Sequence, residues 1–208
     1  MFKIDYDKLK KLNNLFFNNK IDFNTFREER LKITKDIYES KEYKRFLLDK
    51  VELLYNLYKD KIGLDLNEIK DILFTFAYKE SLCNVFEVGD FEISKRYDYH
   101  LPKELWCSWG MFQLYSPIHG YIIKDNQRIG HGWVDIERYR KPDISYQISV
   151  FFDIFKELYK RYSKKVKNKD DLYYLIARDY NGSGDAAEEY AENWLKLYKD
   201  KSYLNFFK

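Results

Sequence analysis

The chain has 208 residues, which is enough for one compact domain with a smaller helical extension but not for two large domains. Its 37 Lys and Arg residues nearly balance its 34 Asp and Glu residues, and a net charge of +3 spread this evenly argues against a nucleic-acid-binding protein. The 20 Tyr and 16 Phe residues, against only 3 Pro and 8 Gly, favour an aromatic core and a mainly helical structure.

The first 20 residues contain no uninterrupted apolar stretch of signal-peptide length and no small-residue cleavage pattern. Export through the general secretory pathway is therefore disfavoured, and we expect synthesis in the cytoplasm. No run of about 18 apolar residues occurs anywhere in the chain, so we also expect no membrane-spanning helix.

Residues 1–65 are predicted to form a helical N-terminal segment with two or three amphipathic helices. Apolar residues recur there at helical spacing: Leu9, Leu12 and Phe16, then Leu47, Val51, Leu54 and Tyr58. The glycine within residues 61–66 predicts a turn, which we take as the domain boundary. This turn is too short to be a flexible linker, so we expect the N-terminal helices to pack on the rest of the chain.

A helix is predicted from about Asn67, capped by Asp65 or Asn67. Its apolar stripe comprises Ile69, Ile72, Leu73 and Phe76. Glu80 follows Phe76 by four residues, so it extends the same stripe close to the helix C-terminus. Desolvation and the negative end of the helix dipole both disfavour a charged carboxylate there, and we expect them to raise its pKa.

Strand and loop signals fill residues 81–142, with a strand expected over Phe86–Ile93 and a hairpin over Tyr121–Trp133. Helical periodicity then returns in a long helix, a shorter helix that leads into Tyr180, and a final helix. Their apolar faces comprise Ile144, Ile148, Phe151, Phe152, Phe155 and Leu158; Leu172, Leu175 and Ile176; and Ala187, Tyr190, Ala191, Trp194 and Tyr198.

Three short motifs occur in order at the ends of these elements: Lys79-Glu80-Ser81, then Ser108-Trp109-Gly110-Met111-Phe112-Gln113, then Asp179-Tyr180-Asn181-Gly182. A fourth, Lys141-Pro142-Asp143-Ile144, opens the long helix. Together they resemble the motifs of the soluble lytic transglycosylase family of the lysozyme-like superfamily. The resemblance extends from Asn67 to Tyr198, although the Pro and Ala that usually follow Glu-Ser in that family are absent here.

The resemblance implies a mainly α fold of the α+β lysozyme-like type. It implies a helical catalytic domain over residues 66–208, with a small β and loop region, preceded by the extra helical segment 1–65. The implied activity is that of a muramidase, which cleaves the bond between N-acetylmuramic acid and N-acetylglucosamine in peptidoglycan. The implied partner is the glycan strand, no cofactor or metal is implied, and we expect a monomer.

The same resemblance assigns roles to individual residues. Glu80 would be the catalytic acid, in keeping with its apolar setting. Ser81 or Ser108 would orient Glu80, and the Gly110 backbone would allow close approach of the glycan. The other expected substrate-binding residues are Met111, Gln113, Tyr180 and Asn181; Tyr180 would lie near the Glu80 carboxyl group.

Two chemistries remain open for this acid. A lytic transglycosylase uses one carboxyl group first as acid and then as base, and forms a 1,6-anhydro product. A hydrolytic lysozyme or phage endolysin instead places a second carboxylate about 5 to 9.5 Å from the acid. Asp90 is the first candidate for that second carboxylate, followed by Glu92 and Asp98.

Other functions also fit parts of the sequence. A non-catalytic wall-binding module of the same fold would explain the residues that depart from the family pattern after Ser81, and a helical interaction protein would explain the N-terminal helices. An enzyme of the wall without a secretory signal would leave the cytoplasm through a holin, within a virion or through a secretion machine. The three Trp residues 106, 109 and 133 are candidates for sugar stacking or for the core.

Histidine and cysteine residues give no separate functional signal. No pair among His100, His119 and His131 has metal-ligand spacing, so structural or solvent-facing roles are favoured. Cys83 and Cys107 match no zinc motif, and reduced thiols are the default expectation; a bridge after export stays open.

Overall fold

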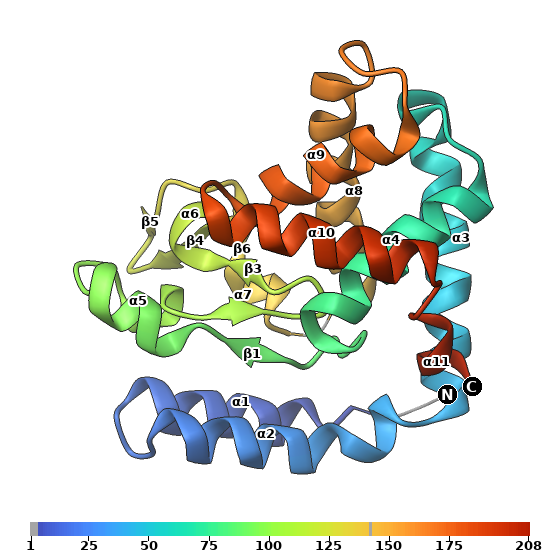
Figure 1. The fold of residues 1–208 in the computed structure, drawn as a ribbon. Helices are drawn as coiled ribbons and strands as arrows, with labels where there is room; N and C mark the ends of the chain where they lie inside the picture. Colours follow the sequence, from blue (N-terminus) through green and yellow to red (C-terminus); the bar gives the residue numbers. More distant parts are fainter. Residues whose placement is uncertain (1–3, 142) are drawn as a thin grey trace. The chain divides into compact units, whose positions relative to one another are not determined.

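The structure is a computed structural model that describes residues 4–141 and 143–208 (Figure 1). Of these residues 66% are helical, and the strands are two to five residues long. The prediction of a mainly α fold is therefore confirmed. No helix in the described ranges combines the length and apolar character needed to cross a bilayer.

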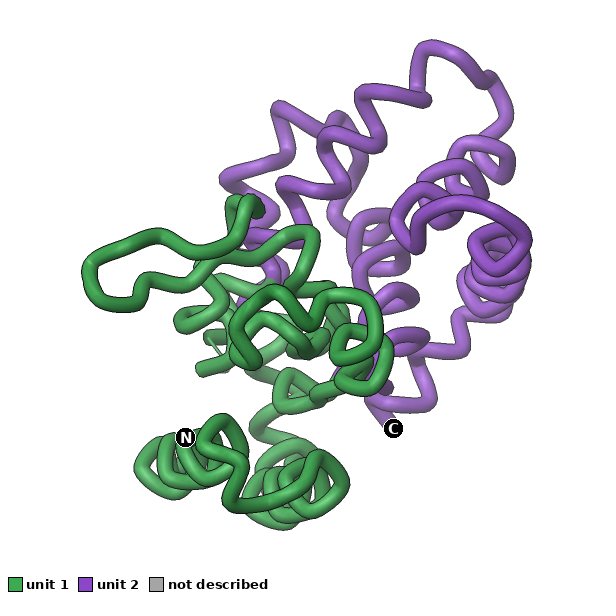
Figure 2. The backbone as a smooth tube through the Cα atoms, turned by 90° about the vertical axis from the view of Figure 1, so that its left-hand side faces the viewer, with its two compact units in different colours: residues 1–48, 84–147 green, residues 49–83, 148–208 purple. Residues whose placement is uncertain are grey.

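The chain divides into two compact units, which Figure 2 shows in different colours. Unit 1 comprises residues 1–48 and 84–147, and unit 2 comprises residues 49–83 and 148–208. Each unit is thus assembled from two segments that are far apart in the sequence. The predicted boundary at residue 65 does not coincide with these units, and the division into an N-terminal extension and a catalytic domain stays a prediction.

Unit 1 begins with a helical hairpin of α1 (Tyr6–Phe17) and α2 (Phe23–Tyr38), which run side by side in Figure 1. Each helix is started by an aspartate cap: Asp5 accepts a hydrogen bond from the Lys8 amide, and Asp22 accepts one from the Thr25 amide. Helix α3 (Lys41–Ile62) follows and contributes residues to both units. The predicted N-terminal helices are therefore present.

Aromatic rings fill the core of unit 1. Phe16 and Phe26 stack across the α1–α2 hairpin with their ring centroids 4.4 Å apart. Phe91 joins them, at 5.1 Å from Phe16 and 4.9 Å from Phe23. Such rings bury large apolar areas, so they contribute strongly to the core of unit 1.

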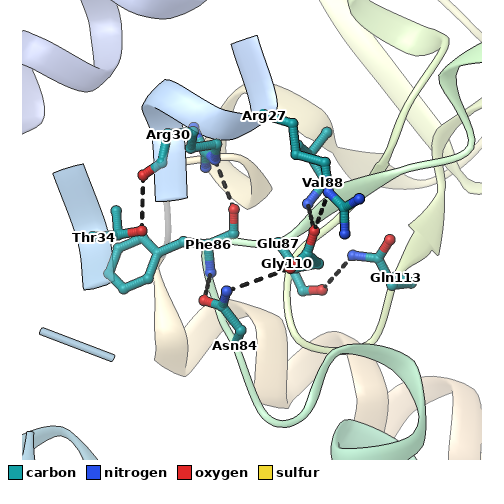
Figure 3. A network of polar contacts seen from close by, with 9 residues as sticks. All are labelled: Arg27, Arg30, Thr34, Asn84, Phe86, Glu87, Val88, Gly110 and Gln113. Atoms are coloured by element: carbon teal, nitrogen blue, oxygen red, sulfur yellow. Dashed lines mark hydrogen bonds and ion pairs between the residues drawn. The ribbon is translucent and has the colours of Figure 1, made fainter. Parts of the chain in front are cut away.

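A buried arginine ties α2 to two distant segments of unit 1. The Arg30 side chain donates a hydrogen bond to the Phe86 carbonyl at 2.7 Å (Figure 3). It also donates to the Arg140 carbonyl at 3.1 Å, and its guanidinium lies 5.4 Å from the Trp109 ring centroid. Arg30 is only 1% exposed. Burial, and then repulsion from Arg140, lower the pKa of Arg30 to about 10, so it stays charged at neutral pH.

Short strands form two small sheets in unit 1. The first has the order β1 (Val88–Gly89), β2 (Ser108–Trp109), β3 (Leu114–Tyr115), and its pairs are antiparallel. The second has the order β5 (Gln127–Ile129), β4 (Gly120–Lys124), β6 (Val134–Asp135), in which β4 and β6 are parallel. Four short helical elements connect or follow these strands: α5 (Phe91–Tyr97), the 3-10 helix η1 (Lys103–Leu105), α6 (Ser116–His119) and α7 (Ile136–Tyr139).

The predicted hairpin is confirmed, because β4 and β5 pair directly and Lys124 lies opposite Gln127. Asp125 and Asn126 form its turn with φ of 50° and 61°, which is the left-handed geometry of a tight two-residue hairpin turn. The predicted strand over Phe86–Ile93 is wrong beyond Gly89. Asp90 has φ of 59° and starts α5 instead, with its carbonyl accepting a hydrogen bond from the Ser94 amide.

Unit 2 consists of helices. After the second part of α3 come α4 (Leu66–Ser81), α8 (Ile144–Tyr162, shared with unit 1), α9 (Lys169–Asn181), α10 (Asp185–Lys199) and the short α11 (Leu204–Phe207). The long helix and its two successors are thus confirmed, and all six apolar residues predicted for the face of α8 are buried. Pro142, in the motif that precedes α8, lies outside the described residues.

We expect replacement of Arg30 by Met to lower the free energy of unfolding by about 2 to 4 kcal/mol, because two buried carbonyl groups lose their donors. The matched control is Arg27→Met, which breaks the 2.9 Å ion pair between Arg27 and Glu87; the Arg27 side chain is 51% exposed. That loss should stay below about 1 kcal/mol. Urea unfolding measures both, and equal losses would contradict a structural role for Arg30.

Candidate functional site

Helix α4 begins and ends at well-defined residues. The Asp65 carboxylate accepts a hydrogen bond from the Glu68 amide at 2.9 Å, so of the two predicted caps it is Asp65 that starts the helix. Leu82 ends it in the left-handed conformation, with φ of 54°, and the Cys83 amide donates back to the Ala77 carbonyl at 2.9 Å. This termination places Glu80 in the last turn, where the sequence predicts it.

The middle of α4 is buried on all sides. The six consecutive residues 72–77 are each no more than 1% exposed, which is the pattern of a helix covered by neighbours all round. Tyr78, Lys79 and Glu80 follow this stretch and are partly exposed. Glu80 therefore lies at the border between the core of unit 2 and its surface, a position that suits a carboxyl group acting on an external substrate.

The Glu80 carboxylate is held by a phenol from another helix. The hydroxyl of Tyr190, on α10, donates a hydrogen bond to Glu80, and the Lys79 ammonium lies 4.4 Å from the centroid of the same ring. Burial, and then the charges of Glu80 and the nearby Tyr180, raise the pKa of Tyr190 well above its ordinary value. The phenol therefore stays protonated near neutral pH and remains a donor to the carboxylate.

Two further carboxylates of α4 are also bound by tyrosine hydroxyl groups. Tyr173 donates to Glu68 at 2.5 Å, and Tyr203 donates to Asp71. Each of these carboxylates is also ion-paired with a lysine, Lys169 at 2.6 Å from Glu68 and Lys201 at 3.0 Å from Asp71. In the last turn the Lys79 ammonium lies over the Tyr190 ring.

Tyr180 and Asn181 occupy the C-terminal end of α9, within the same unit as Glu80. The Tyr180 ring packs against Phe76, one turn before Glu80 on α4, with a centroid distance of 4.6 Å. Asn181 is exposed, and Gly182 and Gly184 after it have φ of 129° and 81°, which only glycine adopts readily. The tight connection brings the end of α9 and the first turns of α10 together beside α4.

Asp179, which precedes Tyr180 in the motif, has a structural role. Its carboxylate accepts hydrogen bonds from the Tyr162 hydroxyl and from Arg161 and Arg178, each guanidinium at 3.0 Å. Burial opposes its charge, but the hydrogen bonds from Tyr162 and then from the two arginines outweigh burial and hold the pKa of Asp179 below its usual value. This network fixes the end of α9, and Tyr180 with it.

Ser81 and Ser108 each use their hydroxyl proton away from Glu80. Ser81 donates to the Ala77 carbonyl of its own helix at 3.2 Å. Ser108 is fully buried in unit 1 and donates to the Asp90 carboxylate at 2.5 Å. The expectation that Ser81 or Ser108 orients Glu80 stays a prediction, and the bond that the structure adds is the one by which Ser108 orients Asp90.

Gly110, Met111 and Gln113 form a rigid turn between β2 and β3 in unit 1 (Figure 3). The Gly110 amide donates to the Glu87 carbonyl at 2.9 Å, and its carbonyl accepts from the Gln113 side chain at 2.9 Å. A Cβ at Gly110 would lie 2.4 Å from Gln147 Oε1, the atom that accepts the Met111 amide at 2.9 Å. The glycine is thus required by internal packing, and Met111 is a core residue with no exposed surface.

The three candidate tryptophans differ in exposure. Trp109 is fully buried, and Trp106 is half-buried with its indole donating to the Leu101 carbonyl at 2.8 Å. Trp133, next to the β4–β5 hairpin, is 48% exposed and is therefore the candidate for stacking on a sugar ring. Among the residues that the structure describes, no three His, Cys, Asp or Glu side chains are placed to hold a metal ion.

Both cysteines are buried free thiols, Cys83 in unit 2 and Cys107 in unit 1. Burial raises the pKa of each thiol far above its usual value. Neither is therefore a reactive nucleophile at neutral pH.

The predicted site residues fall into two groups. Unit 2 contains Glu80, Ser81, Tyr180 and Asn181, and unit 1 contains Asp90, Ser108, Gly110, Met111 and Gln113. Tyr190 and Lys79 were not predicted as site residues. The sequence places Tyr190 on the apolar face of the last helix, but periodicity gives no information on the acceptor that its hydroxyl finds.

We expect Asp179→Asn to lower the free energy of unfolding by about 1 kcal/mol at pH 7. Because the folded-state pKa is lowered, this stability is present above the unfolded pKa of about 3.9 and is lost as pH falls through the folded value. Urea unfolding at pH 7, 5 and 3 should show the difference from the wild type shrink as the pH falls below the unfolded pKa. Glu192→Gln, at an exposed position of α10, is the control, and a difference for Asp179→Asn that is as large at pH 3 as at pH 7 would contradict the role given to its charge.

Comparison with known proteins does not assign this chain to a family. No family model, no curated protein and no solved structure matches it. The resemblance of its four motifs to those of the soluble lytic transglycosylases stays a prediction from the sequence, and the functional argument rests on the residues described above.

Proposed function

We propose that the protein is a muramidase of the lytic transglycosylase type, which cleaves the β-1,4 bond between N-acetylmuramic acid and N-acetylglucosamine in peptidoglycan. The observation that carries the proposal is the setting of Glu80. Its carboxyl group lies at the end of a buried helix, is oriented by a phenol from α10, and lies one turn from the residue that packs on Tyr180. The position of Glu80 at a helix end, followed by Ser81, also matches the motif pattern that led to the prediction.

The reaction requires one carboxyl group that acts twice. Protonated Glu80 donates its proton to the glycosidic oxygen as the bond from C1 of N-acetylmuramic acid breaks. The resulting carboxylate then accepts the proton of the sugar's own C6 hydroxyl while the oxygen of that hydroxyl bonds to C1. The product is a 1,6-anhydro sugar, no water is consumed, and Glu80 regains its proton for the next cycle.

Candidate substrate-binding residues are assigned within each unit by itself. In unit 2 the exposed Asn181 side-chain amide is suited to hydrogen-bond the acetamido groups of the glycan. Tyr180 packs on Phe76, one turn before Glu80. In unit 1 the Gln113 side chain donates one N–H to the Gly110 carbonyl, and its carbonyl oxygen and second N–H are the groups suited to a polar substrate. The exposed Trp133 ring offers a stacking surface for a sugar.

A hydrolytic mechanism is the second candidate, and the observation that favours it is the state of Asp90. Asp90 is exposed, and its carboxylate is oriented by the buried Ser108 hydroxyl. An oriented, accessible carboxylate can activate water or act as a nucleophile in glycoside hydrolysis. Hydrolysis would give reducing ends in place of anhydro ends, so the products distinguish the two mechanisms.

We expect Glu80→Gln to reduce the lysis of purified sacculi by about 100-fold or more, because Gln cannot donate the proton. The matched control is Glu68→Gln, which changes a carboxylate on the same helix that is likewise bonded to a tyrosine. This control should keep its activity. Loss of turbidity of sacculi measures both variants; equal clearing by Glu80→Gln and the wild type, or no clearing by the wild type, would contradict the assignment.

A further inference from the structure

Two consecutive residues of α4 engage a single phenol. The Tyr190 hydroxyl donates to the Glu80 carboxylate, while the Lys79 ammonium lies over the face of the same ring at 4.4 Å from its centroid. The hydrogen bond fixes the oxygen end of Tyr190, and the cation–π contact fixes the face of its ring. The phenol is thus held on two sides by the turn of helix that carries the proposed acid.

We propose that Tyr190 is a positioning residue for Glu80, which orients the carboxyl group and stabilises its charged form after the proton has been transferred. This inference rests on the proposed function of Glu80 as proton donor. It assigns the role of phenol partner to a residue of α10 that lies outside the four motifs of the sequence. Lys79 acts through Tyr190 by holding its ring.

The chemistry of proton donation explains why a phenol suits this position. When Glu80 gives its proton to the glycosidic oxygen, negative charge develops on its carboxyl oxygens. A hydrogen bond to a charged acceptor is stronger than one to a neutral acceptor, so the Tyr190 bond strengthens as the proton leaves. The bond therefore favours the state with the transferred proton.

Among the described residues, Lys79 on α4 and Tyr180 on α9 are charged or titratable groups that face the Tyr190–Glu80 pair. The raised pKa of Tyr190 supports the assignment, because a phenol that keeps its proton can donate to the Glu80 carboxylate over the whole working range of pH. Tyr180 packs on Phe76 and contributes to the surroundings of Tyr190.

The same helix supplies a matched control. Tyr203 donates to Asp71 in the same way, but Asp71 is also ion-paired with Lys201 at 3.0 Å and has no proposed catalytic role. Tyr203→Phe therefore removes a tyrosine–carboxylate hydrogen bond from α4 without touching the pair in its last turn. A purely structural contribution of such bonds would affect Tyr190→Phe and Tyr203→Phe alike.

The test measures the titration of the Glu80 carboxyl carbon by NMR in the wild type, Tyr190→Phe and Tyr203→Phe. Tyr190→Phe keeps the ring and its contact with Lys79 but removes the donor, so the Glu80 midpoint should rise by about one to two pH units. Tyr203→Phe should leave it unchanged. If Tyr190→Phe does not fold, Lys79→Met is measured in its place. Loss of the Lys79 ammonium frees the Tyr190 ring and should raise the Glu80 midpoint by a smaller amount than Tyr190→Phe.

The kinetic readout on sacculi separates this inference from the proposed function. In Tyr190→Phe the alkaline limb of the pH–rate profile should move to higher pH. The kcat at neutral pH should fall by about 10- to 100-fold with little change in KM. If Glu80→Gln is inactive but Tyr190→Phe leaves the Glu80 midpoint unchanged, the role of Tyr190 is overturned and the proposed function stands. If Tyr190→Phe shifts the Glu80 titration but the wild type has no lytic activity, the proposed function is overturned and the coupling between Tyr190 and Glu80 stands.

Discussion

The burial of α4 is the constraint on which the rest of unit 2 depends. A helix whose central residues 72–77 are all covered needs neighbours on every side, and aromatic residues of α8, α9 and α10 supply them: Phe76 alone contacts the rings of Phe151, Tyr180 and Trp194. A charged group is costly inside such a core, so none occurs among residues 72–77, and Lys79 and Glu80 follow only in the last turn. This is why Glu80 lies at the border of the core, within reach of Tyr190.

Residues that resemble family motifs often have a structural explanation in this protein, and the two roles are compatible. Gly110 is required because Gln147 fills the space where a Cβ would lie, and Asp179 anchors the end of α9 through Tyr162 and two arginines. A rigid turn and a fixed helix end are also what a binding site needs, since they hold Gln113, Tyr180 and Asn181 in place. Structural necessity alone therefore does not argue against function.

The sequence predicts those features that depend on local periodicity and turn chemistry. Helix α8, the β4–β5 hairpin and the position of Glu80 in the last turn of α4 follow from spacing alone. The error at Phe86–Ile93 has a local cause, because buried Phe86 and Val88 continue an alternating pattern until the left-handed Asp90 interrupts it. The burial of Arg30 and the pairing of Tyr190 with Glu80 depend on tertiary contacts, which periodicity does not encode.

The central claim is that Glu80 alone serves as acid and then base in cleavage of the glycan strand. Mass spectrometry of the muropeptides released from purified sacculi tests it most directly. The account predicts 1,6-anhydro-N-acetylmuramic acid ends with the wild type and no released fragments with Glu80→Gln. Reducing ends from the wild type, or fragments released by Glu80→Gln at the wild-type rate, would contradict it.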